Sequence, residues 1–397
     1  MTDPAFHLPP LLQPADLLAL ISSLGLPAPA STEPLTVTAS FHRIYLIHFP
    51  PSATPSLAPA RPNHDGSTTL VLRVAGPHLP RIKTENEIAL MKWVRENTSI
   101  PVPAVIRWDS SCENVLGREF SLLERIPGRS ADKIIWDADD EKKRKIVAQL
   151  VGFLAQLREK STWRHVGGLR VDDDQGAIVP GPVVDEWFWM GPQLARFWGG
   201  TGETVDSLNP VSGPFATWAA HADASMGKYI RVISLHPQLA WMRDLIPRLE
   251  SFRAFVRPRA DELEDTEYVL AHRDLHLANV MVDGAGTVTG VLDWEFGGVV
   301  PGPRWDPPNA FLYPWGGGEG DEAKRERDRM RGWAREICRS RGLGEDLVDG
   351  IRYRGCQEGV HFVLNYTRAI CELWREERGG EQGWRKTLEG ELGKLGL

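Results

Sequence analysis

Short apolar runs and one helical pattern alternate in the first third of the chain. A helix is expected over residues 14–24, where Gly25 provides a stop signal. A second helix is expected from about 83 to 95, because apolar residues recur there at helical spacing. The stretch 50–67 is rich in Pro, Ser and Ala and predicts a loop. Apolar and β-branched runs predict strands over residues 35–38, 44–49, 69–74 and 120–126.

A Pro-Gly break at 127–128 separates this sheet-rich part from a longer, mainly helical part. Two β-branched runs, 280–282 and 288–292, flank an Asp-Gly-Ala-Gly segment and predict a hairpin. Helices are expected over residues 146–157, 215–233, 237–255, 321–341 and 346–378. We therefore expect an α+β protein with an N-terminal extension at 1–34, a small lobe at 35–127 and a helical lobe at 128–397.

Composition narrows the class of partner. The 397 residues are 42% apolar and 25% charged, which is ordinary for a folded chain. The net charge of −7 argues against nucleic acid, because a phosphate-binding surface needs a basic excess. It is compatible with a cationic or polar small molecule. The oligomeric state is not readable from these features.

The cysteines and the N-terminus bear on location. Four cysteines lie far apart and form no metal-spaced pair, so we expect reduced thiols. No Lys or Arg precedes Arg43, whereas secretory and mitochondrial leaders need basic residues. No apolar run is long enough to span a bilayer, so no membrane partner is expected. Cytoplasm is the expected compartment.

The most specific pattern lies around the predicted hairpin. Asp274 is followed five residues later by Asn279 and nineteen residues later by Asp293. Phosphoryl-transfer sites commonly combine one carboxylate for the acceptor proton with an Asn and an Asp for magnesium. The hairpin would bring the three side chains to one point.

Two other interpretations of this pattern stay open at this stage. Each residue taken alone could cap a turn or end a strand. His272, Asp274 and His276 could also bind zinc, although that leaves Asn279 and Asp293 without a role.

The His-x-Asp-x-His-x-x-Asn run and the following Val-Leu-Asp-Trp-Glu resemble the aminoglycoside phosphotransferase family. This family is the small-molecule branch of the protein-kinase-like fold. The resemblance extends over about residues 36–305 and is strongest over 269–295. It implies a two-lobed fold, with a small β-rich lobe and a larger helical lobe. It also implies transfer of the γ-phosphoryl of ATP or GTP to a hydroxyl of a small molecule.

The resemblance also assigns roles in the catalytic loop. Asp274 would be the catalytic base, and Asn279 and Asp293 would be the Mg²⁺ ligands, as hard oxygen donors. His272 would brace the loop through its backbone or act in the chemistry directly. His276 would contact substrate or phosphate, or order the loop.

A cation and its acidic partner are expected in the small lobe. Arg73 stands where protein kinases have a Lys that pairs with the nucleotide phosphates. Arg keeps the charge but presents a planar fork. By its spacing, Glu87 matches the family's acidic position best, and Glu85 is the second choice.

The expected nucleotide contacts depart from the family in one place. The stretch 39–43, where a Gly-rich turn would lie, contains no glycine, so Ser40, Phe41 and backbone amides would have to meet phosphate. Residues 123–126 match the hinge that binds the nucleobase through its backbone, with Glu124 and Ile126 as candidate contacts.

Further candidates lie outside this set. Asp306 resembles a family Asp that supports the catalytic loop, and it could equally be a turn residue before Pro307. Trp187 and Trp189 form an aromatic patch that is either core or binding site, beside the acidic pair 185–186.

The sequence thus predicts a small-molecule kinase that uses ATP or GTP and Mg²⁺. The alternative from another class is a non-catalytic kinase-like binding or scaffold protein, favoured by the glycine-free loop and by Arg73. Within the enzyme class, choline-like amines or metabolite hydroxyls could replace antibiotics as acceptors. Acceptor specificity is expected in residues 160–260 and 310–390, where no motif is found.

Overall fold

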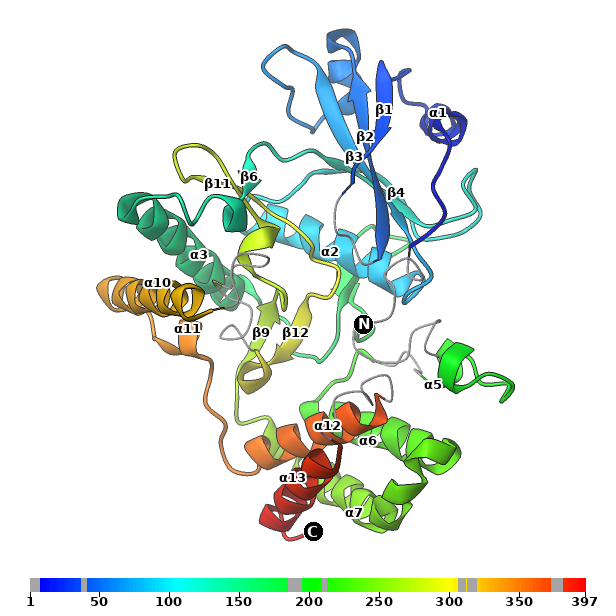
Figure 1. The fold of residues 1–397 in the computed structure, drawn as a ribbon, viewed down its shortest axis with the longest axis vertical. Helices are drawn as coiled ribbons and strands as arrows, with labels where there is room; N and C mark the ends of the chain where they lie inside the picture. Colours follow the sequence, from blue (N-terminus) through cyan, green and yellow to red (C-terminus); the bar gives the residue numbers. More distant parts are fainter. Residues whose placement is uncertain are drawn as a thin grey trace.

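The computed structural model describes residues 8–36, 41–184, 195–208, 213–305, 312, 320–372 and 381–397. A five-stranded antiparallel sheet in the order β1-β2-β3-β5-β4 forms the small lobe (Figure 1). Its strands are β1 (Ser31–Pro34), β2 (His42–Phe49), β3 (Thr68–Ala75), β4 (Val105–Asp109) and β5 (Phe120–Glu124).

Helix α1 (Pro14–Ser23) covers one face of this sheet. Its apolar stripe of Leu17, Leu20 and Ile21 is buried in one core with the sheet residues Tyr45 and Leu72. The same core contains residues of a 3-10 helix, η2 (Pro51–Leu57), so the stretch predicted as a loop is in part helical. Apolar burial of this kind stabilises by roughly 25 cal/mol per Å².

The first strand lies at Ser31–Pro34 and not at 35–38 as predicted. Its polar residues pair with β2, and the ladder continues as the Leu35 amide donates to the Ile44 carbonyl (2.8 Å). Val37 and Thr38 lie outside the described residues.

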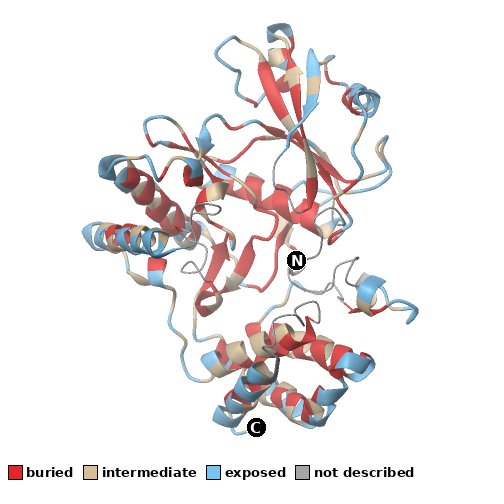
Figure 2. Cartoon of the chain, viewed as in Figure 1, coloured by how far each residue is buried: buried red, intermediate tan, exposed pale blue. Residues whose placement is uncertain are grey.

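Helix α2 (Ile82–Asn97) lies between the two lobes (Figure 1). It is buried on nearly every side, as its red colouring in Figure 2 shows. Its apolar residues Ile88 to Val94 pack in the core of the large lobe and not in the core under α1. The helix that carries Glu87 is therefore fixed mainly by the large lobe.

The large lobe combines helices with short sheets. Small antiparallel pairings join β6 to β10, β10 to β11, β9 to β12 and β7 to β8. The strands are β6 (Arg129–Ser130), β7 (Leu169–Val171), β8 (Ile178–Pro180), β9 (Tyr268–Ala271), β10 (Val280–Val282), β11 (Val288–Val291) and β12 (Gly298–Pro301). The α-helices are α3 (Asp140–Lys160), α5 (Val205–Leu208), α6 (Trp218–Leu235), α7 (Ile246–Val256), α8 (Ala260–Leu263), α10 (Asp321–Ser340), α11 (Asp346–Asp349), α12 (Gln357–Cys371) and α13 (Glu381–Lys394). Short 3-10 helices are η3 (Ala131–Lys133), η4 (Pro237–Leu245), η5 (Arg257–Arg259), η6 (Leu277–Asn279) and η7 (Gly302–Arg304).

Two predicted helices are interrupted in the structure. The stretch 237–255 divides into η4 and α7, with Pro247 in the first turn of α7, where a missing N–H costs nothing. The stretch 346–378 divides at Gly350, whose φ of 88° suits glycine and ends α11. Helix α13 was not predicted. None of the helices in the described residues is both long and apolar enough to cross a membrane.

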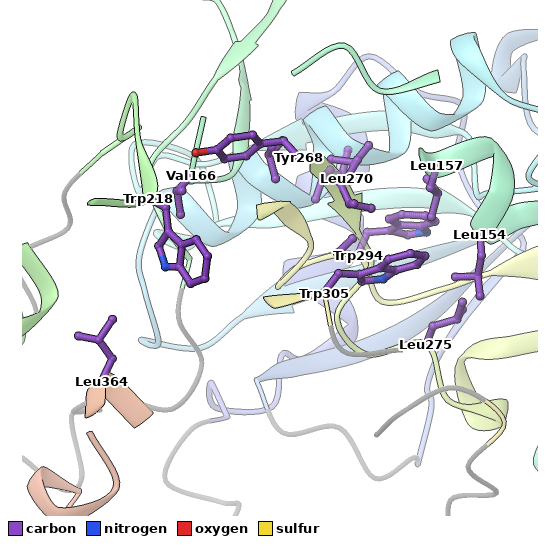
Figure 3. Packing of buried hydrophobic residues seen from close by; sticks show 14 of the residues in the cluster. Leu154, Leu157, Val166, Trp218, Tyr268, Leu270, Leu275, Trp294, Trp305 and Leu364 are labelled. Carbon is purple, nitrogen blue, oxygen red and sulfur yellow. The ribbon is translucent and has the colours of Figure 1, made fainter. Parts of the chain in front are cut away.

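The predicted hairpin is present as β10 and β11. The Asp283 carboxylate accepts from the amides of Ala285 and Thr287 (2.9 and 2.8 Å), which closes the turn. Beneath the hairpin, Trp294 and Leu275 pack with Leu154 and Leu157 of α3 (Figure 3). This apolar base holds the loops before β10 and after β11 in place.

Together these elements form a two-lobed α+β fold of the protein-kinase-like type, with a small β-rich lobe and a larger helical lobe. The lobe boundaries at 34/35 and 127/128 stay predictions.

Candidate active site

The loop between β9 and β10 is held by His272. Its Nε2 donates to the Leu292 carbonyl (2.8 Å), and its Nδ1 accepts from the Asp274 amide (3.3 Å). The ring also lies against Trp294, with ring centroids 4.4 Å apart. Burial lowers the pKa of His272, which favours the neutral ring that these bonds require. With both nitrogens occupied, His272 has none left for zinc.

Asp274 and Asn279 are joined directly. The Asn279 Nδ2 donates to the backbone oxygen (3.0 Å) and to Oδ2 (3.2 Å) of Asp274. His276 Nε2 lies 3.5 Å from the same Oδ2. The Asp274 side chain is nevertheless 43% exposed, so its carboxylate is accessible from solvent.

Asp293 lies next to this pair. The Leu292 amide donates to the Asn279 carbonyl (2.8 Å), which sets the residue after Leu292 beside Asn279. Asp293 has a φ of 65°, in the left-handed region that few non-glycine residues adopt. Such backbone conformations persist where the surrounding structure holds them, and they cluster at functional sites.

Arg73 of β3 connects both lobes. Its Nη1 lies 3.1 Å from Glu87 Oε1, and its Nη2 donates to Asp293 Oδ1 (3.1 Å) and lies 3.5 Å from Glu295 Oε2. Glu85, the second choice for this pair, contacts Arg81 instead. The structure therefore brings Arg73 together with Glu87 and also with Asp293.

The carboxylates around Arg73 are strongly affected by burial. Glu87 and Glu295 expose only 2% and 5% of their side chains. Burial raises the pKa of Glu295 to about 7 and raises the pKa of Glu87, while Arg73 acts against both shifts. Burial alone would lower the pKa of Arg73, but the neighbouring carboxylates raise it above its ordinary value.

A second cation, Lys83, was not predicted. Its Nζ lies 3.2 Å from Glu295 Oε2 and 3.1 Å from His42 Nε2, within a nearly closed environment. Burial, together with Lys83 and Arg73, lowers the pKa of His42, so that ring is neutral and accepts from Lys83. Its partners lie on other elements, far from Lys83 in the sequence, so no local pattern indicated this contact.

Phe41 closes the small-lobe side of the site. Its ring stacks on His78, with centroids 4.5 Å apart, and meets Phe296 edge-on at 5.5 Å. Lys83 Nζ lies 5.8 Å from the centre of the same ring. Ser40 lies outside the described residues.

Comparison with known proteins identifies the family. A sequence model of the phosphotransferase enzyme family matches residues 63–306, more than half of the chain. The chain belongs to this family. The match contains Arg73, Glu87, the loop 272–279 and Asp293, which the fold brings together.

Individual relatives of this phosphotransferase-family protein are distant. It is similar to the clavilactone A biosynthesis cluster protein Y of Ampulloclitocybe clavipes, with 24% identity over 55% of this chain and 50% of that protein. It is also similar to a subtelomeric hrmA-associated cluster protein of Aspergillus fumigatus, with 22% identity over 57% and 52%. The chain thus spans about half the length of the curated relatives it matches.

Solved structures with a similar fold include aminoglycoside phosphotransferases. The streptomycin–ATP ternary complex of APH(2")-IIa is 12% identical, with a TM-score of 0.49 and coverage of 96% of this chain and 99% of that chain. The GDP complex of aminoglycoside 2'-phosphotransferase-IIIa is 13% identical, with a TM-score of 0.44 and coverage of 95% and 97%.

The predicted hinge of this phosphotransferase-family protein, residues 123–126, begins within the last two residues of β5. The Glu124 carboxylate is used within the lobe, where it pairs with Arg61 and accepts from the Ala104 amide (3.0 Å). The Glu124 amide donates to the Ala104 carbonyl (2.9 Å). Ile126 is buried against Gly290 of β11. The Arg125 amide donates to the Thr69 carbonyl (3.3 Å), so the amides of both Glu124 and Arg125 are bonded within the lobe. A nucleobase contact at 123–126 stays a prediction.

The donors expected for Mg²⁺ have suitable chemistry. The Asn279 Nδ2 donates to Asp274, so the oxygen of the same amide, Oδ1, remains as a candidate metal ligand. Asp293 adds a carboxylate that is 36% exposed. These are hard oxygen ligands, and Mg²⁺ is usually held by few protein ligands plus phosphate. Within the described ranges, no cluster of three or more His, Cys, Asp or Glu is placed to hold a metal.

Several predicted residues lie outside the described part of the chain. They are Asp185, Glu186, Trp187, Trp189 and Asp306. Their expected roles stay predictions.

Proposed function

We propose that this protein transfers the γ-phosphoryl group of ATP or GTP to a hydroxyl of a small molecule. The observation that carries the proposal is the convergence of Asp274, Asn279 and Asp293 opposite the Arg73–Glu87 pair. One relative's name places it in a biosynthesis cluster, which is compatible with a metabolite acceptor.

In the proposed reaction Asp274 accepts the proton of the acceptor hydroxyl. A bond forms between that oxygen and the γ-phosphorus, while the bond from the γ-phosphorus to the bridging oxygen breaks, and a nucleoside diphosphate leaves. Asn279 holds Asp274 through one hydrogen bond to its backbone carbonyl and one to its carboxylate, so little reorganisation is needed. His272 positions the loop and does not itself act as base.

The nucleotide phosphates would meet cations from the small lobe. Arg73, whose side chain is 12% exposed, would contact the phosphate chain, while Lys83 is 1% exposed and would act on that charge only from within the protein. Asn279 and Asp293 would hold Mg²⁺, which would neutralise charge on the transferring group when bound.

The central test replaces the proposed base. Asp274→Ala should reduce magnesium-dependent turnover by about 100- to 10,000-fold, because the proton would lose its acceptor. Nucleotide binding, measured as the thermal shift with ATP or GTP and Mg²⁺, should be largely retained. Asp173→Ala is a matched control, because that carboxylate is exposed and its ion pair with Arg81, at 4.0 Å, is weak.

Full turnover in Asp274→Ala would overturn the mechanism. Absence of any thermal shift with ATP or GTP in the unaltered protein would instead favour a non-catalytic, kinase-like scaffold. The acceptor can be sought by screening metabolites for magnesium-dependent nucleotide consumption.

A further inference from the structure

One face of α2 contacts the segment that contains Asp293 and the residues after it. The residues of this face, which are three and four positions apart, are Lys83, Asn86 and Glu87. Lys83 Nζ lies 3.2 Å from the Glu295 carboxylate, and Glu87 is connected to Asp293 through Arg73. A single helix face thus supports the segment with the proposed metal ligand.

Asn86 attaches this segment to α2 directly. It is 1% exposed, and its Nδ2 donates to the carbonyl oxygens of Glu295 (3.0 Å) and Gly297 (2.9 Å). Its Oδ1 accepts from the Leu169 amide (2.8 Å). Both Nδ2 hydrogens are used, and a side-chain amide has only two. Asn86 therefore holds two backbone positions shortly after Asp293 at once.

The backbone around Asn86 approaches it closely. A Cβ built on Gly168 would lie 2.3 Å from Asn86 Oδ1, and one built on Gly297 would lie 2.9 Å from Cδ1 of Leu90, also on α2. Side chains at these two glycines would push the segment and the amide apart. The place of the Asn86 amide is thus closely defined.

The other flank of Asp293 is held by the catalytic loop. The Leu292 amide donates to the Asn279 carbonyl, and the Leu292 carbonyl accepts from His272 Nε2 (both 2.8 Å). Between these attachments Asp293 has a φ of 65°. A non-glycine residue keeps such a conformation only where its surroundings hold it. Here the loop holds one flank of Asp293 and Asn86 holds the other.

A pocket of about 710 Å³, including space open to solvent, also borders this segment through residues 297–300. Faces of α6 and α12 form its walls, and Figure 1 shows these helices together below β12. Arg273 lines the pocket directly before Asp274, so an acceptor bound there would lie beside the proposed base. None of the described residues that line it belongs to α2, so Asn86 acts on the segment from within the protein.

We infer that Asn86 is a positioning residue for Mg²⁺, because it keeps the Asp293 carboxylate beside Asn279, where both can bind the metal. The inference rests on the proposed function, since it takes these two residues as the ligands. Without the Asn86 amide, the segment could relax towards an ordinary backbone conformation and carry Asp293 away from Asn279. Removing a partner that orients a metal ligand typically lowers metal affinity about 10- to 100-fold.

The test measures how strongly Mg²⁺ enhances nucleotide binding. Isothermal titration gives the Kd for ATP and for GTP in EDTA and in Mg²⁺, at a temperature where thermal melts show the protein to be folded. Asn86→Leu should reduce the ratio of these two Kd values about tenfold. The Kd in EDTA should stay largely unchanged, because Glu87 still holds Arg73. Asp293→Asn should reduce the ratio at least as much.

Gln357→Leu is the matched control. Gln357 is fully buried, and its Nε2 donates to the carbonyl oxygens of Leu263 (3.1 Å) and Asp265 (3.3 Å), while its Oε1 accepts from the Arg354 amide (2.9 Å). This variant loses the same kinds of bond outside the proposed site, so it should lose stability and keep the Kd ratio.

A milder pair of variants decides the matter if Asn86→Leu does not fold. Asn86→Ala leaves space in which water can meet the freed carbonyls, and Gln357→Ala is its control. Asn86→Ala should again reduce the Kd ratio, whereas Gln357→Ala should not.

The outcomes separate the inference from the proposed function. If Mg²⁺ enhances nucleotide binding equally in the Asn86 and Gln357 variants, or if Asp293→Asn has no effect, the positioning role of Asn86 is overturned. If the Asn86 variants alone lose the enhancement but no acceptor is phosphorylated, the inference stands and the proposed reaction fails. If the unaltered protein shows no enhancement by Mg²⁺, the inference fails whatever the turnover.

Discussion

At the scale of single residues, Arg73 shows why a guanidinium suits this site. Its two terminal nitrogens contact different partners, with Glu87 on one side and Asp293 and Glu295 on the other. A lysine has only one nitrogen and could not span the same set. The departure from the usual kinase lysine is thus accompanied by an additional buried carboxylate, Glu295.

Removing this charge should destabilise the fold. Arg73→Met leaves the buried Glu87 carboxylate without the guanidinium that pairs with it and leaves Glu295 with Lys83 alone. The free energy of unfolding should fall by about 3–5 kcal/mol in urea denaturation. Arg335→Met, which breaks an exposed pair, should cost less than about 1 kcal/mol. Equal effects in both variants would mean that burial of the Arg73 cluster is not energetically important.

His361 should make stability depend on pH. Its pKa is about 3 in the folded chain, mainly through burial and the nearby arginines, and about 6.5 when unfolded. The unfolded chain therefore binds more protons between these values, so stability falls as pH is lowered from about 6.5 towards 3. At pH 5 this loss reaches up to about 2 kcal/mol. His361→Gln should flatten the dependence in denaturation curves; an unchanged slope would contradict the assignment.

At the scale of elements, the predicted hinge packs against a glycine in β11. A Cβ built on Gly290 would lie 2.6 Å from Cγ2 of Ile126, which is closer than real Cβ contacts. Strand β11 thus packs against the segment 124–126, and any side chain at position 290 would displace Ile126.

Gly290→Ala should therefore lower the affinity for ATP or GTP several-fold, because overpacking shifts the proposed nucleobase contact. Gly284→Ala in the adjoining turn is the matched control, since nothing lies within 4 Å of a Cβ there. Isothermal titration of both variants measures the difference. Unchanged affinity in Gly290→Ala would show that Ile126 does not shape the nucleotide site.

The elements also show what local sequence can and cannot predict. The hairpin of β10 and β11 was predictable, because Asp283 and alternating β-branched residues act within a dozen positions. Strand β1 was misplaced, because its residues are polar and pair only through β2. Glu295 and Lys83 are 212 residues apart, so their contact has no local signal. Arg73 and Glu87 were found through a family resemblance that carries such long-range information.

At the scale of the whole molecule, the boundary between the two main hydrophobic cores does not coincide with the boundary between the two lobes. Apolar residues of α2 belong to the large-lobe core, while β2 and β3 form a core with α1. Asn86 strengthens this attachment. It donates to the carbonyl oxygens of Glu295 and Gly297 (3.0 and 2.9 Å) and accepts from the Leu169 amide (2.8 Å).

Hydrogen exchange should therefore group α2 with the large lobe. Amides of residues 82–97 should show protection close to that of α3, and higher than that of β2 and β3. Asn86→Leu should remove this excess protection, because three buried backbone groups lose their partner at about 1–3 kcal/mol each. Exchange of α2 together with β2 and β3 in the unaltered protein would contradict this division.

The walls formed by α6 and α12 have a consequence for how such a protein can evolve. Residues 221, 225 and 229 of α6 and residues 365 and 368 of α12 line the pocket beside Arg273 and lie outside the loop 272–279. Substitutions there can exchange one acceptor for another while the phosphoryl-transfer machinery stays intact. Lineages that adopt new substrates should therefore diverge first on these two helix faces.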